Sequence, residues 1–145
     1  MATQDLESIV GGLLALPFPP NETQQGDGAS GPGYHVRVLR ASQGFWEDRS
    51  EETVEAAEKE IDAAFQALVA ALTARWGGPE AIDLEPYLWS EDPVPEPISS
   101  LCQLSGEMLV WRQPDATRWV AVTVGQGDPE FPIELLAAVG EASIP

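Results

Sequence analysis

The sequence predicts an α+β fold: a mainly antiparallel sheet with a C-terminal meander, packed by one long amphipathic helix and a C-terminal helix. Residues 50–76 carry apolar side chains at helical spacing over an unusually long stretch. Residues 98–124 contain three short apolar runs separated by turn-forming residues, which is typical of antiparallel strands. A chain of 145 residues is within the usual size of one domain.

The chain begins with a predicted short helix, residues 1–16, in which apolar residues recur at helical spacing. A helix of this length is marginal by itself, so it must dock on its own domain, on another copy or on a partner. We expect the first of these. Residues 17–33 are rich in Pro, Gly, Asn and Gln and predict a flexible linker. A single α+β domain then fills residues 34–145.

Residues 34–40 alternate apolar and polar side chains and predict a first, half-buried strand. The long helix follows at 50–76, where Asp48 or Ser50 can cap its N-terminus and a Gly-Gly-Pro sequence ends it. Its apolar stripe must be covered by a sheet or by other helices. The large residues of this stripe are Val54, Ile61, Phe65, Leu68 and Leu72.

The C-terminal half is predicted to supply the rest of the sheet. Expected strands cover residues 81–88, 98–104, 107–112 and 118–124, and a buried helix covers residues 131–139. If the last predicted hairpin turns symmetrically about Asp115, Trp111 and Trp119 are cross-strand neighbours on one face of the sheet.

Charge is the unusual feature of the composition. Twenty-four acidic residues face seven basic ones, which gives a formal net charge of −17. Such a field repels the phosphate backbone of nucleic acid and anionic membranes, and it attracts a protein partner with a basic surface. We therefore expect no direct nucleic-acid binding.

The same composition predicts where the protein resides. No apolar run reaches the length of a membrane span, and the N-terminus lacks the positive charge of a secretory signal. The single cysteine, Cys102, allows no internal disulfide and fits a reducing compartment. Its apolar neighbours predict a buried, inert thiol. We expect a cytoplasmic protein, and the preference for Arg over Lys together with abundant Ala, Gly and Pro suggests a bacterial source.

Candidate partner-binding residues lie on and near the long helix. Glu51, Glu55, Glu58 and Asp62 project within an arc of roughly 60°, beside the apolar stripe and not opposite it. Like charges at this spacing repel by about 0.2–0.5 kcal/mol per pair. The row is either a docking surface for a basic partner or a solvated helix face. Two loop tryptophans, Trp46 and Trp89, are candidate interface anchors, although packing within the fold is the ordinary use of tryptophan.

The sequence contains no catalytic or metal-binding motif that we can identify. The only histidine, His35, is expected at the surface or rim of the first strand. No histidine lies on the acidic helix and no calcium-loop spacing is present, so we expect no metal site. Gly125 and Gly127 lack the other elements of a dinucleotide fingerprint, so we expect no cofactor.

These patterns favour a non-enzymatic acidic interaction protein, of the immunity, antitoxin, adaptor or chaperone type, that binds a basic protein partner. Two alternatives stay open. One is an acidic mimic of nucleic acid that inhibits a DNA-binding protein. The other is a small enzyme whose site is assembled from scattered residues, such as Arg37, Arg40, Glu107, Arg112 and His35. A deep pocket lined by several of these would favour the enzyme.

Overall fold

The structure, a computed structural model, describes residues 2–112, 117–141 and 144, with side chains from Leu6 onward. The described residues form four helices and seven strands. The helices are α1 (Ala2–Ala15), α2 (Glu51–Trp76), α3 (Glu85–Leu88) and α4 (Ile98–Leu101). The strands are β1 (Thr23–Gln25), β2 (Gly28–Gly31), β3 (Tyr34–Ala41), β4 (Glu80–Asp83), β5 (Glu107–Arg112), β6 (Trp119–Gly125) and β7 (Glu134–Gly140).

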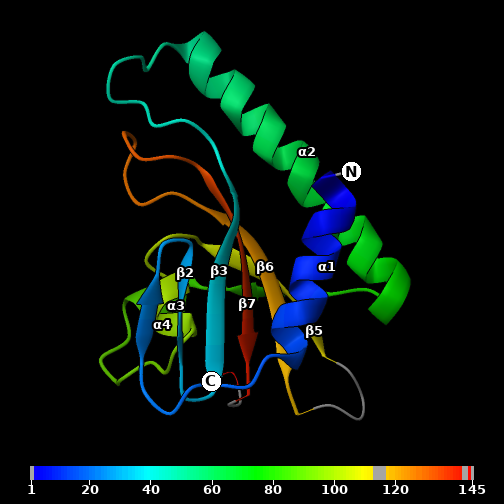
Figure 1. The fold of residues 1–145 in the computed structure, drawn as a ribbon. Coiled ribbons are helices and arrows are strands. Elements are labelled where there is room, and N and C mark those ends of the chain that lie inside the picture. The colour runs from blue at the N-terminus through cyan, green and yellow to red at the C-terminus, as the bar shows by residue number, and fades with distance from the viewer. Residues whose placement is uncertain (1, 113–116, 142–143, 145) are drawn as a thin grey trace.

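All seven strands belong to one antiparallel sheet, in the order β1-β2-β3-β7-β6-β5-β4. Figure 1 shows α1 and α2 on one side of this sheet and the short helices α3 and α4 on the other. Each side has its own apolar core, one built on residues of α1 and α2 and the other on Leu84, Ile98 and Leu101. The predicted α+β class, with its long helix and C-terminal meander, is confirmed.

The long helix α2 begins and ends where local signals place it. The Ser50 hydroxyl accepts a hydrogen bond from the Thr53 backbone N–H at 3.3 Å. Asp48 accepts from the Ser50 N–H at 2.9 Å and from the Thr53 hydroxyl at 2.8 Å, and these bonds hold the pKa of its carboxyl below the usual value. The helix ends at Gly77, whose φ of 88° suits glycine best.

The short helix α1 docks on the core of its own domain, as we expect from its spacing. Leu6, Val10 and Leu13 are buried in the same apolar core as α2. Arg118, from the start of the β6 segment, donates to the carbonyl oxygens of Leu14 and Leu16 at 3.0 and 2.6 Å. A cation is favourable at this helix end, where the carbonyl groups have no partners within the helix.

The predicted C-terminal helix is wrong, because most of residues 131–139 belongs to the central strand β7. This strand pairs with β3 on one side and β6 on the other. Its residues from Leu135 to Gly140 are all buried, and none of them has a polar side chain. A short apolar run buried on both faces of a sheet has no alternation, and periodicity cannot separate it from a buried helix.

Two segments that are predicted as strands contain short helices. Residues 81–88 divide into β4 and α3, and Pro86 lies in the first turn of α3, where its missing N–H is not needed. Residues 98–104 contain α4 and not a strand. There the Glu96 carboxylate accepts hydrogen bonds from both the backbone N–H and the hydroxyl of Ser100, each at 2.8 Å. This local capping favours a helical turn.

The predicted pairing of Trp111 with Trp119 is also wrong. Trp111 lies opposite Val120, and Trp119 lies opposite Arg112. This register differs by one residue from a turn centred on Asp115, which lies outside the described residues, and one residue moves a side chain to the other face. Trp111 therefore packs in the core with α2, where its ring N–H donates to the Gly77 carbonyl at 3.0 Å, and Trp119 packs in the opposite core.

The segment predicted as a linker contributes two strands to the edge of the sheet. β1 pairs with β2, and β2 pairs with β3. A side chain at Gly28 would clash with the Val36 carbonyl, so this close pairing requires glycine there. A glycine-rich composition thus reflects tight strand contact here. Flexibility of residues 17–33 and the division into domains stay predictions.

Candidate partner-binding site

The predicted acidic residues lie in a row along α2, beside its apolar stripe. Glu51, Glu55, Glu58 and Asp62, which we call the acidic strip, are all exposed. Among the described residues, no ion pair involves any of these four carboxylates. Asp62 accepts one long hydrogen bond, at 3.5 Å, from Gln66 one turn further along the helix. The strip therefore presents four carboxylates that form no ion pair within the described part of the fold.

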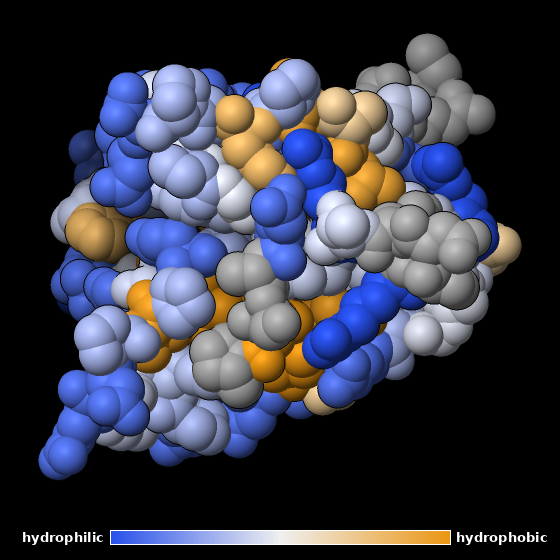
Figure 2. All heavy atoms as spheres, turned by 90° about the horizontal axis from the view of Figure 1, so that it is seen from below, coloured by the Kyte–Doolittle hydropathy of each residue, from blue (hydrophilic) through white to orange (hydrophobic). Residues whose placement is uncertain are grey.

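The basic residues of the chain are largely engaged elsewhere. Arg118 binds the end of α1, and four other arginines lie in ion pairs. These pairs are Arg37 with Asp27, Arg49 with Glu130, Arg75 with Glu7 and Arg112 with Glu80, at 3.3–3.7 Å. Seen from below, hydrophilic residues cover much of the visible surface and hydrophobic residues show as separate patches between them (Figure 2).

A groove of about 830 Å³ lies beside the acidic strip, between α2 and one end of the sheet. Its α2 side is lined by Val54, Phe65 and the strip residues Glu58 and Asp62. Its opposite side and floor come from the loop before β5, from β5 and β6, and from Ile133. The structure thus brings two of the four strip residues to the border of an apolar depression, which the sequence prediction did not include.

Close contacts hold the sheet side of the groove in place. The Thr123 hydroxyl lies 2.7 Å from the Ser105 hydroxyl and donates to the Glu107 carbonyl at 2.6 Å. The Gln126 N–H donates to the Leu104 carbonyl at 3.0 Å. A side chain at Gly125 would come within 2.9 Å of that same carbonyl oxygen, so glycine allows the loop to approach the end of β6. The loop before β5 is therefore tied to the neighbouring strand.

Charge and burial change across the groove. Val54, Phe65, Leu109 and Val124 line it and are only half buried, whereas Val122 and Met108 are buried. Glu58, Asp62 and Glu107 bring three carboxylates, and Lys59 brings one ammonium group, so the lining carries a net charge of −2. The groove is an apolar depression with a negative border.

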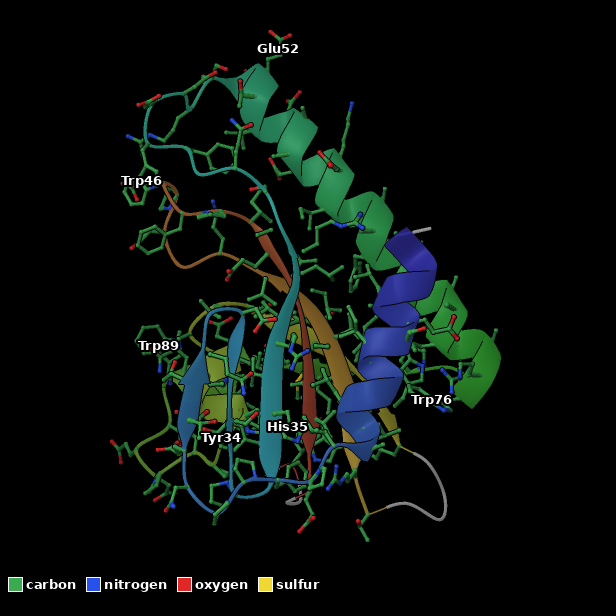
Figure 3. The ribbon with its side chains drawn as sticks, viewed as in Figure 1. Tyr34, His35, Trp46, Glu52, Trp76 and Trp89 are labelled. Atoms are coloured by element: carbon green, nitrogen blue, oxygen red, sulfur yellow. The ribbon has the colours of Figure 1, made fainter. Side chains whose placement is uncertain are left out.

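The two candidate tryptophans are exposed, as an interface role requires. Trp46 is 65% exposed and packs edge-on against Phe131, with 5.2 Å between the ring centroids. Trp89 is 74% exposed and follows α3. Figure 3 shows both on the side of the molecule away from α1. Neither lines the groove, and their role in an interface stays a prediction.

His35 is buried, and the expectation of a surface or rim position is wrong. It is 1% exposed, its Nε2 donates to the Leu16 carbonyl at 3.1 Å, and its Nδ1 accepts from the Ser30 hydroxyl at 2.6 Å. Its ring lies 4.9 Å from that of Phe18. Alternation places it opposite Val36, as we expect, but that face of β3 is covered by the segment after α1, which the sequence cannot show. His35 therefore joins the N-terminal segment to the sheet (Figure 3).

The scattered residues of the enzyme alternative do not meet in the groove. Of Arg37, Arg40, Glu107, Arg112 and His35, only Glu107 lines it. Burial raises the pKa of Cys102 and of Glu134, and burial together with a hydrogen bond to Glu22 raises the pKa of Tyr34 to about 12. These three groups lie outside the groove lining as well.

Among the described side chains, no group of three or more His, Cys, Asp or Glu residues lies close enough to hold a metal ion. Within the described ranges, no helix combines the length and the apolar character that crossing a membrane needs.

Comparisons of the chain with protein-family models, with curated proteins and with solved structures found no match.

Proposed function

We propose that this protein is a non-enzymatic acidic interaction protein of the bacterial cytoplasm that binds a protein partner with a basic surface. The observation that supports this proposal is the acidic strip, a row of four exposed carboxylates without an ion-pair partner in the described part of the chain. Complementary charge raises association rates and favours basic over acidic partners. A reduced cytoplasm suits the single buried cysteine.

A capture experiment with the immobilised full-length protein tests this proposal. Lysate of the host is applied at an ionic strength of about 0.1 M and of about 1 M, where the screening length falls from about 10 to about 3 Å. We expect a retained basic protein at low salt and its loss at high salt. Replacement of all four strip residues by Gln or Asn should abolish the capture of this basic protein without unfolding the chain.

A control variant keeps the total charge change the same. Glu85, Glu91, Asp92 and Glu141 are also exposed and lie outside α2. Their replacement by Gln or Asn removes four charges as well, and it should retain the partner. If both variants lose the partner equally, the strip acts only through its contribution to the overall negative charge. Capture that resists both salt and the strip variant would contradict the proposal.

The identity of the captured protein separates the proposal from the alternative of a nucleic-acid mimic. If the partner binds DNA, and if DNA competes with this chain for it, the mimic of nucleic acid is favoured. A partner that this chain and DNA bind together would favour the adaptor, immunity or chaperone types.

A further inference from the structure

The groove beside the acidic strip has an apolar lining that the fold leaves incompletely covered. The α2 stripe residues Ile61, Leu68 and Leu72 are buried, but Val54 and Phe65, which belong to the same stripe, are only half buried. Both of these residues line the groove, together with the half-buried Leu109 and Val124 of the sheet. Covering such side chains removes apolar surface from water, so an apolar occupant would be stabilised there.

The charges around the groove restrict what that occupant can be. Glu58, Asp62 and Glu107 line it together with a single cation, Lys59. A purely apolar occupant would remove water from these carboxylates and give them no partner. Lys or Arg side chains next to the apolar ones would form charge-assisted hydrogen bonds with them. A second copy of this chain, with a net charge of −17, would bring like charges against the groove.

The shape of the groove favours a segment of a protein over a small molecule. The groove is widely open to solvent, whereas small molecules are usually enclosed over most of their surface. Its volume of about 830 Å³ suits a row of side chains and not a whole helix. On the same face of the sheet, α1 lies beside the other part of α2 and buries Leu6, Val10 and Leu13. This face and α2 therefore already hold one amphipathic helix.

We propose that the groove binds an amphipathic helix of the partner, whose apolar side chains enter it while flanking Lys and Arg side chains reach Glu58, Asp62 and Glu107. This mode is the docking of an amphipathic helix in a hydrophobic groove. It rests on the proposed function, because it assumes a basic protein partner. It adds the place of binding and the pattern that is recognised: an apolar stripe next to positive charge.

A defined peptide tests this proposal without knowledge of the natural partner. The probe is a labelled peptide of leucine and lysine, with leucines at i, i+3, i+4 and i+7 spacing so that they form one stripe. The control peptide has the same composition, with leucines placed on all sides of the helix. Fluorescence anisotropy with the full-length protein should show binding of the striped peptide that is about tenfold tighter or more, a difference of about 1.4 kcal/mol.

Two double variants that remove charges locate the binding site. The double variant Glu58→Gln with Asp62→Asn changes groove residues, and the double variant Glu51→Gln with Glu55→Gln changes strip residues outside the groove. Both remove two charges from the same exposed side of α2. The first should weaken the striped peptide at least about threefold more than the second. Equal weakening would overturn the groove proposal and leave the acidic strip as the binding surface.

Variants without charge change test the apolar part. Phe65→Ser and Val54→Ser should each weaken the striped peptide by about tenfold, and Leu88→Ser, at an exposed leucine outside the groove, should not. Val54 is the fourth residue of α2, near the helix end, so its variant keeps the test valid if Phe65→Ser unfolds the protein. If all three serine variants bind alike, the groove proposal is wrong. If no charge variant has any effect, the proposed function fails as well.

Discussion

The two parts of α2 are covered differently, although one amphipathic pattern runs through both. Around residues 66–76, α1 lies alongside the helix (Figure 1), Leu68 and Leu72 are buried, and Arg75 pairs with Glu7 of α1. Around residues 51–65, no other helix of the described chain lies alongside. There the half-buried Val54 and Phe65 face a groove, and the four carboxylates of the acidic strip form no ion pair within the described part of the chain.

This difference gives the two parts of α2 different roles: the C-terminal part stabilises the fold, and the N-terminal part is a candidate for binding a partner. In the C-terminal part, apolar side chains and charges find partners inside the chain, so their contribution is to the folded state. In the N-terminal part, Ile61 is buried but Val54 and Phe65 are only half buried, and a partner can supply the missing cover and the missing positive charge. Because α1 covers only the C-terminal part of α2, this helix contributes both to the core and to a candidate binding surface.

The largest effect that tests this comparison is expected at Leu68. This residue is 0% exposed, so Leu68→Ala removes a fully buried side chain and should lower the free energy of unfolding by about 2–5 kcal/mol. Phe65→Ala should cost less than the about 3–5 kcal/mol of a fully buried Phe, because part of its ring already faces water. Urea denaturation measures both. If Phe65→Ala costs as much as Leu68→Ala, the N-terminal part of α2 is as well covered as the other part.

A smaller effect is expected where α1 is held on the fold. Arg118→Met removes two hydrogen bonds to the carbonyls of Leu14 and Leu16, and the contact of the guanidinium with the Phe18 ring at 3.8 Å. Hydrogen bonds of charged groups contribute about 1.5–3 kcal/mol, so we expect a loss in that range. Amide hydrogen exchange should become faster throughout α1.

A second arginine provides the control for this prediction. Arg112 forms an exposed ion pair with Glu80 at 3.3 Å, and such pairs contribute about 0–1 kcal/mol. Arg112→Met should therefore change stability little and leave exchange in α1 unaltered. If both variants behave alike, Arg118 does not hold α1, and the close cover of the C-terminal part of α2 depends on apolar packing alone.

The features that sequence predicts correctly here are those with local causes. The cap at Ser50, the stop at Gly77 and the stripe between them predict α2, and spacing alone places Glu51, Glu55, Glu58 and Asp62 in one row. The groove has a non-local cause, because its other side comes from residues more than 40 positions away, around Leu109 and Val124. One feature of the sequence is consistent with the groove: the acidic row lies beside the apolar stripe and not opposite it, so charged and apolar residues share a border.

Three of the incorrect predictions have physical causes that a local pattern does not contain. Strand β7 lies at the centre of the sheet, and burial on both faces removed the alternation that identifies a strand. A register change of one residue separated Trp111 from Trp119. His35 is buried because the segment after α1 returns over β3, a contact between positions 19 residues apart. Each of these three errors concerns which parts of the chain meet.

The smallest expected effect concerns the N-terminal end of α2, which has a cap but no covering helix. Asp48 accepts hydrogen bonds from the Ser50 N–H and the Thr53 hydroxyl, and these lower its pKa from the usual value of 3.8. The ionised form is thus favoured in the folded state. Its contribution to stability is complete above about pH 4 and is lost as the pH falls through the lower folded value.

Comparison with Asp48→Asn isolates this contribution from that of the other carboxylates, because Asn does not titrate. The wild-type protein should be slightly more stable than the variant from about pH 7 to about pH 5, and the difference should shrink below about pH 4. Urea denaturation and amide exchange in the first turn of α2 measure it at each pH. A difference that stays constant down to the lowest pH would show that the ionised carboxylate does not cap α2. The N-terminal part of the helix would then depend on Ser50 alone, whose hydroxyl accepts from the Thr53 N–H at every pH.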